Sequence, residues 1–147
     1  MIFGSQYFRP PFPYKEYWEK DLDNIKSLNF NTVKLWAVWN WIERQPGVYP
    51  FDDLDELVAL CGKKGINVII NIIPEGAPYW TSNGELGAYY EKSTGELLKY
   101  SGPANIPSAG WPGLCPDSPE FSDIIHRFIT AVTSHYADND TVVCFDV

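Results

Sequence analysis

The stretch from Phe30 to Phe51 constrains the fold more than any other, because an apolar segment passes directly into a loop rich in aromatic and charged residues. Residues 32–38 are β-branched, aromatic or otherwise apolar at most positions, which predicts a short strand. The loop that follows carries Trp39, Asn40 and Glu43. An apolar strand that ends in side chains able to bind a ligand is typical of a parallel sheet, whose strand ends face the binding site.

Apolar runs and amphipathic segments alternate along the rest of the chain. Strands are predicted at 2–8, 32–38, 66–73 and 141–147, and helices at 14–28, 52–64 and 118–136. The helical segments carry apolar residues at spacings of three and four, with charged residues on the opposite side. This alternation predicts an α/β fold with a parallel sheet and right-handed crossovers.

Capping residues help to place the helix boundaries. Asp52 is predicted to be the N-cap of the second helix, and Gly65 can take the left-handed conformation that follows a helix end. Ser118 is predicted to cap the third helix, where Pro119 suits the first helical position. Residues 74–117 lack sustained periodicity, and loops of that length in a compact domain are usually functional.

Two architectures fit the alternating order. A doubly wound sheet often uses a glycine-rich phosphate loop after its first strand, and the sequence contains no such motif. A (β/α)8 TIM barrel builds its site from all the loops that follow strands, which fits the long, decorated loops after the second and third strands. Such barrels need about 250 residues, so this chain is predicted to form the first half of one.

The amino-acid composition limits the classes of molecule that the protein is expected to bind. The chain has 11 basic and 19 acidic residues, a net charge of −8, and no basic run, which argues against nucleic acid and anionic membranes as partners. The sequence has no apolar stretch long enough to span a bilayer, and its three cysteines form no C-x-x-C pair. We therefore expect a cytoplasmic protein with reduced thiols and no cofactor.

Aromatic residues make up 16% of the chain and include six tryptophans, several of them in predicted loops. Flat apolar rings beside polar groups suit sugars, whose C–H faces stack on indole. The residues predicted to bind a carbohydrate are Glu75, Trp80, Trp111, Trp39 and Asn40, all in the loops after strands. We expect Trp36 to lie in the core or the barrel interior, and Glu43 to pair with Arg44 or to contribute to the same rim.

Five segments, in this order, resemble glycoside hydrolase family 42, the β-galactosidase family of the (β/α)8 retaining glycosidases. They are YWEKDLDNIKSLNFNTVKLW, WNWIERQPGVYPFDDLDELV, GINVIIN, PEGAPYW and CPDSPEF. Their order and spacing cover essentially the whole chain. The resemblance implies that residues 1–147 are one partial catalytic domain, the amino-terminal half of the barrel.

The resemblance also implies hydrolysis of a β-glycosidic, mainly β-galactosidic, bond with retention, as part of carbohydrate metabolism. In this family the acid/base glutamate follows an asparagine beyond the fourth strand, and the nucleophile follows the seventh. Residues 144–147, CFDV, resemble that fourth strand, so no catalytic residue is expected within this chain. Cys115 matches a cysteine that some members use to bind zinc, but one cysteine cannot define a tetrahedral site, and no metal is expected here.

Other functions remain open on the sequence alone. A half-barrel could serve as a non-catalytic carbohydrate-binding or scaffold module, and a doubly wound nucleotide-binding domain would have the same alternation of elements. A half-barrel would also leave its first and fourth strands as open edges, through which self-association is possible.

Overall fold

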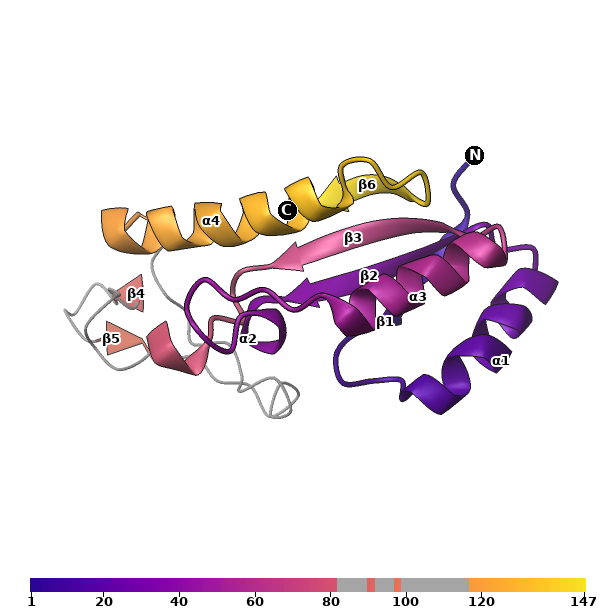
Figure 1. The fold of residues 1–147 in the computed structure, drawn as a ribbon, viewed down its shortest axis with the longest axis horizontal. Helices are drawn as coiled ribbons and strands as arrows, with labels where there is room; N and C mark the ends of the chain where they lie inside the picture. Colours follow the sequence, from indigo (N-terminus) through magenta and orange to yellow (C-terminus); the bar gives the residue numbers. More distant parts are fainter. Residues whose placement is uncertain (82–89, 92–96, 99–116) are drawn as a thin grey trace.

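The computed structural model describes residues 1–81, 90–91, 97–98 and 117–147. Four parallel strands form one sheet in the order β1-β2-β3-β6 (Figure 1). Their bounds are Gly4–Phe8, Thr32–Val38, Asn67–Ile73 and Val142–Asp146. A short antiparallel pair, β4 (Tyr90–Glu91) and β5 (Leu97–Leu98), falls within the predicted loop. The sheet order follows the chain order, which is what a barrel requires, so this prediction is confirmed.

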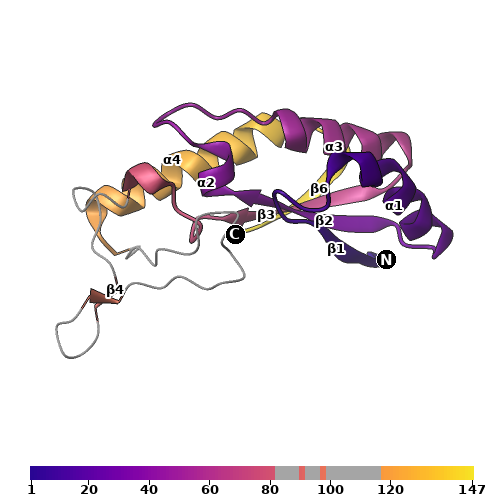
Figure 2. The same ribbon diagram turned by 90° about the horizontal axis from the view of Figure 1, so that it is seen from below.

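The long helices α1 (Lys15–Ser27), α3 (Asp52–Lys63) and α4 (Pro119–Tyr136) lie on one side of the sheet, as Figure 2 shows. Two short helical elements were not predicted, the helix α2 (Trp39–Ile42) and the 3-10 turn η1 (Tyr79–Thr81). Helices on one side only agree with the predicted half-barrel. Among the helices in the described part of the chain, none combines the length and apolar character needed to cross a bilayer.

The sheet has one covered face and one open face. On the covered face, alternate residues of β2 and β3 are buried to within 2% exposure: Val33, Leu35, Ala37, Val68, Ile70 and Ile72. The residues between them point to the other face because side chains alternate along a strand. That open face carries an ion pair between Lys34 on β2 and Asp146 on β6. The hydrophobic core therefore lies between the sheet and the helices.

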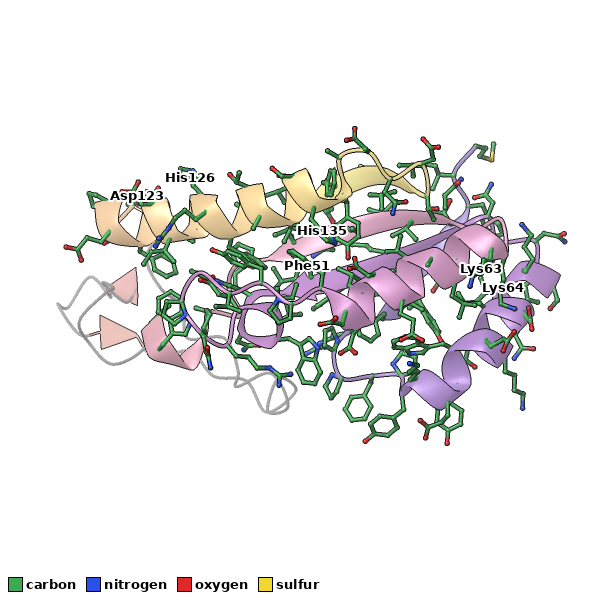
Figure 3. The ribbon with its side chains drawn as sticks, viewed as in Figure 1. Phe51, Lys63, Lys64, Asp123, His126 and His135 are labelled. Carbon is green, nitrogen blue, oxygen red and sulfur yellow. The ribbon has the colours of Figure 1, made fainter. Side chains whose placement is uncertain are left out.

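A polar and aromatic contact joins α3 to α4. The ring of His135 stacks on Phe51 with centroids 4.3 Å apart, and Figure 3 shows the two side chains next to each other. Asp55 Oδ1 lies 2.7 Å from His135 Nε2 and accepts the Tyr136 hydroxyl at 2.7 Å. These contacts fix the amino-terminal end of α3 against the last turns of α4.

The structure corrects two details at the ends of elements. Ile2 and Phe3 were predicted within the first strand, but β1 begins at Gly4 and both side chains are more than half exposed. Asp52 is the first residue of α3 and not its N-cap, a position taken by Phe51. Asp52 still lies in the first turn, where a negative charge is favourable near the positive end of the helix.

Raised pKa values predict a loss of stability in alkali. Burial raises the pKa of the Cys61 thiol from 9.0 to about 12, and burial also raises the pKa values of Tyr7 and Tyr136. The unfolded chain releases these protons at a lower pH than the folded chain does. The free energy of unfolding should therefore stay constant below pH 9 and decrease from there toward pH 12. Cys61 alone would account for as much as about 4 kcal/mol.

Urea denaturation between pH 7 and pH 11 tests this expectation. Cys61→Ala should flatten part of the alkaline decline, whereas the change at exposed Cys144, Cys144→Ala, should not. An unchanged alkaline slope in Cys61→Ala would remove this thiol from the explanation.

Candidate functional site

The carboxyl ends of β2 and β3 meet at one edge of the sheet, and the segments that follow them are bonded to each other. The backbone N–H of Asn40 in α2 donates to the carbonyl of Gly76 after β3, at 2.8 Å. A Cβ atom at Gly76 would lie 2.9 Å from Val38 Cγ1, so a larger residue here would force the Val38 side chain or the backbone to move. The two loops therefore form one surface.

Glu75 and Asn40 lie at this edge, as predicted. Glu75 is exposed. The side-chain Oδ1 and Nδ2 atoms of Asn40 are buried and have no hydrogen-bond partner among the described residues. Buried polar groups normally have partners, so an unsatisfied amide at a strand end has the capacity to bind a polar ligand. Of the residues predicted to bind a carbohydrate, Asn40 is therefore the one whose side chain has buried polar atoms available to a ligand.

Trp80 also belongs to this edge and is held in a defined orientation. Its Nε1 donates to the backbone carbonyl of Glu43 at 3.0 Å, and its ring meets Trp39 edge to face with centroids 6.3 Å apart. Trp80 is only partly buried. A fixed indole with exposed surface is suited to stacking on a sugar ring.

Trp39 has a packing role in the structure, in place of the predicted contact with a sugar. Its side chain is 0% exposed and stacks on Phe128 of α4 at 5.5 Å, with Phe121 at 5.7 Å. A ring enclosed in this way offers no face to a ligand. Trp111 and Cys115 lie outside the described residues.

Glu43 is the residue whose surroundings the sequence did not reveal. It is 2% exposed, and its carboxylate accepts the indole N–H of Trp39 and, at 2.7 Å, the backbone N–H of Gly47. Arg44, the predicted partner, instead donates to the carbonyl of Trp41 and lies over the Trp41 ring at 4.6 Å. The loop after β2 is thus built around a buried carboxylate.

A hollow of about 220 Å³ lies beside the ends of β1 and β2. Its lining includes Trp36, Trp41, Arg44 and Asp53, and Asp53 accepts the indole N–H of Trp41 at 3.2 Å. Trp36 lies on the open face of the sheet, the face that a complete barrel would enclose, in agreement with the expected core or barrel-interior position. In this chain it is partly exposed there and lies beneath the guanidinium of Arg9 at 5.0 Å. Aromatic and charged groups therefore surround the strand ends on both sides of α2.

Comparison with known families settles the relationship of this sheet to barrel enzymes. The sequence pattern of the glycoside hydrolase family 42, described as beta-galactosidase, matches residues 7–147. The chain belongs to this family. The family-42 chain has a sequentially ordered parallel sheet covered by helices on one side, as expected of part of a (β/α)8 barrel, and the doubly wound alternative is set aside.

Individual relatives agree with this assignment. An exo-beta-D-glucosaminidase of Pyrococcus horikoshii is 36% identical over 116 residues, which are 73% of this chain and 14% of that protein. Beta-galactosidase BbgII of Bifidobacterium bifidum is 26% identical over 153 aligned positions, covering 100% of this chain and 20% of that protein. The family-42 chain therefore spans about one fifth, or less, of the length of these relatives.

Solved structures show the same fold. The beta-galactosidase of the haloarchaeon Halorubrum lacusprofundi superposes with a TM-score of 0.82 at 23% identity, over 99% of this chain and 20% of that one. The beta-galactosidase of the psychrophilic Marinomonas ef1 gives a TM-score of 0.81 at 17% identity, over 97% of this chain and 21% of that one. At these identities the likeness establishes the architecture.

Proposed function

We propose that this chain is the amino-terminal part of the catalytic barrel of a retaining β-glycosidase that acts on β-galactosides. The family match over residues 7–147 carries the proposal. The polar and aromatic groups at the strand ends support it, because barrel enzymes bind their substrates at that edge. A cytoplasmic location is part of the proposal, supported by the free thiols of Cys61 and Cys144.

Retention requires two carboxyl groups about 5 to 5.5 Å apart, an acid/base and a nucleophile. The resemblance to the family assigns both to sequence beyond residues 1–147. In the proposed enzyme, this chain therefore binds and orients the sugar. Asn40 and Glu75 bind hydroxyl groups, and Trp80 stacks on the C–H face of the ring, with Trp111 as a further predicted contact.

Trp80→Ala in the complete enzyme should weaken galactoside binding by about 1–3 kcal/mol, because a large aromatic contact is lost. Steady-state kinetics on a chromogenic β-galactoside would show this as a higher KM. Tyr17→Ala on α1, which removes an exposed ring far from the strand ends, is the matched control and should leave the kinetics unchanged. Unaltered kinetics in Trp80→Ala would remove Trp80 from the site.

Glu75→Gln distinguishes binding from catalysis. Loss of one charge-assisted hydrogen bond to a sugar hydroxyl should raise KM by about tenfold while turnover persists at saturation. Parallel assays on a chromogenic β-glucosaminide test the activity named for the Pyrococcus horikoshii relative. Turnover of the glucosaminide alone would overturn the proposed galactoside preference, and turnover of neither would favour the non-catalytic binding module.

A further inference from the structure

Glu43 is a buried acid that the proposed chemistry does not use. Together with Thr32 and Thr81 it makes up the buried polar residues of the described chain, and it alone of the three is ionisable. A carboxylate removed from water is costly unless hydrogen bonds replace the lost solvation. Its presence at 2% exposure therefore calls for a compensating set of donors.

The loop after β2 supplies that set. Glu43 Oε2 accepts the indole N–H of Trp39, and Oε1 accepts the backbone N–H of Gly47 at 2.7 Å. Burial raises the pKa of Tyr49, and the negative charge of nearby Glu43 raises it further. Each of these donors is neutral, so the carboxylate organises the loop as an acceptor for groups from its own neighbourhood.

The same residue reaches the predicted sugar site through its backbone. The carbonyl of Glu43 accepts the Trp80 indole N–H at 3.0 Å, and Trp39, bonded to the Glu43 carboxylate, meets the Trp80 ring edge to face. The Glu43 carbonyl and the Trp39 ring, which is bonded to the Glu43 carboxylate, thus fix the plane and the tilt of the Trp80 indole. A shift of the Glu43 backbone would move both contacts together.

We propose that Glu43 is a positioning residue that sets the orientation of Trp80, and so shapes the sugar-binding wall without touching the substrate. The expected change in kinetics rests on the proposed glycosidase function, whereas the contacts that orient Trp80 do not. Glutamine at this position keeps the size of the side chain but turns an N–H₂ group toward one of the donors. The loop must then shift to relieve that contact.

The kinetic test uses the complete enzyme and four variants. Glu43→Gln should raise KM for a β-galactoside by about tenfold with a smaller change in kcat, since it disturbs a binding residue. In a Trp80→Ala background the same change should have little further effect on KM, because the group it acts through is gone. Glu56→Gln, an equal charge change at an exposed residue of α3, should match the parent enzyme. Multiplicative effects of Glu43→Gln and Trp80→Ala would overturn the proposal.

A second measurement does not depend on activity. With 5-fluorotryptophan incorporated, the Trp80 resonance in the ¹⁹F spectrum is assigned by its loss in Trp80→Phe. Glu43→Gln should shift the Trp80 and Trp39 resonances, and Glu56→Gln should shift neither. An unchanged Trp80 resonance in a folded Glu43→Gln protein would contradict the positioning role of Glu43. If the parent enzyme turns over no glycoside, the proposed function fails while this spectrum still decides the role of Glu43.

Tyr49→Phe covers the case in which Glu43→Gln does not fold. It removes a hydroxyl whose pKa the nearby Glu43 charge raises and keeps the ring, so a smaller shift of the same Trp80 resonance is expected. No shift of that resonance in folded Tyr49→Phe would then count against the proposal.

Discussion

Trp39→Ala is expected to destabilise the protein by about 3–5 kcal/mol, the cost of truncating a large, fully buried aromatic side chain. The ring packs on Phe121 and Phe128 and supports Trp80, so its removal leaves a cavity between the sheet and α4. The loss of its indole N–H also removes a donor from the buried Glu43 carboxylate. Urea denaturation followed by circular dichroism would measure the change in unfolding free energy.

Trp41→Ala is the matched control because it makes the same chemical change two residues along the chain. Trp41 stacks with Arg44 and bonds to Asp53 at the surface, contacts worth about 1 kcal/mol. Equal destabilisation by the two changes would contradict the distinction between a packing Trp39 and a surface Trp41.

If the proposed glycosidase function is right, residues 1–147 expressed alone are expected to give no glycoside turnover, in contrast to the complete protein. The reason is that a retaining glycosidase needs two carboxyl groups across the scissile bond. Of the two acids that the sequence places after β2 and β3, Glu43 is buried among its hydrogen-bond donors and Glu75 alone is exposed. A chromogenic galactoside assay checks this, and turnover abolished by Glu75→Gln would place the chemistry in this chain after all.

The isolated chain is also expected to self-associate. β1 and β6 are the outer strands of the sheet, and no other strand in the described part of the chain pairs with their outward edges, which leaves backbone groups available to other chains. Light scattering should therefore report dimers or larger species, and a monodisperse monomer would contradict this account.

The sequence predicts the scaffold well because the signals for it are repeated along the chain. β2 has its predicted bounds, 32–38, and the three long helices agree with prediction to within about a residue at each end. Each of those helices runs for at least three turns, so apolar spacing identifies it reliably. The sequential strand order followed from the same alternation.

The site was harder to predict because its details depend on contacts between distant segments. α2 has only four residues, Trp39–Ile42, too few for any periodicity to be visible. The burial of Trp39 depends on α4, some eighty residues away in sequence, and the Glu43 contacts depend on how the chain turns at Gly47. Trp-Asn-Trp followed by Glu and Arg reads as an exposed binding loop, although one of its tryptophans and its glutamate are buried.

Because neighbouring strands of the sheet follow one another along the chain, the sheet can assemble in the order in which its strands are synthesised. β2 pairs with β1, and β3 with β2, so each new strand finds its partner already made by the preceding part of the chain. In a longer protein, these residues would leave the ribosome before the later strands of the barrel, so the helix-covered face could form before those strands are made. The open face, with Lys34 and Asp146 bridging it, would stay in water until later strands arrive. We expect nascent-chain pulling experiments to register a folding event once β3 has emerged.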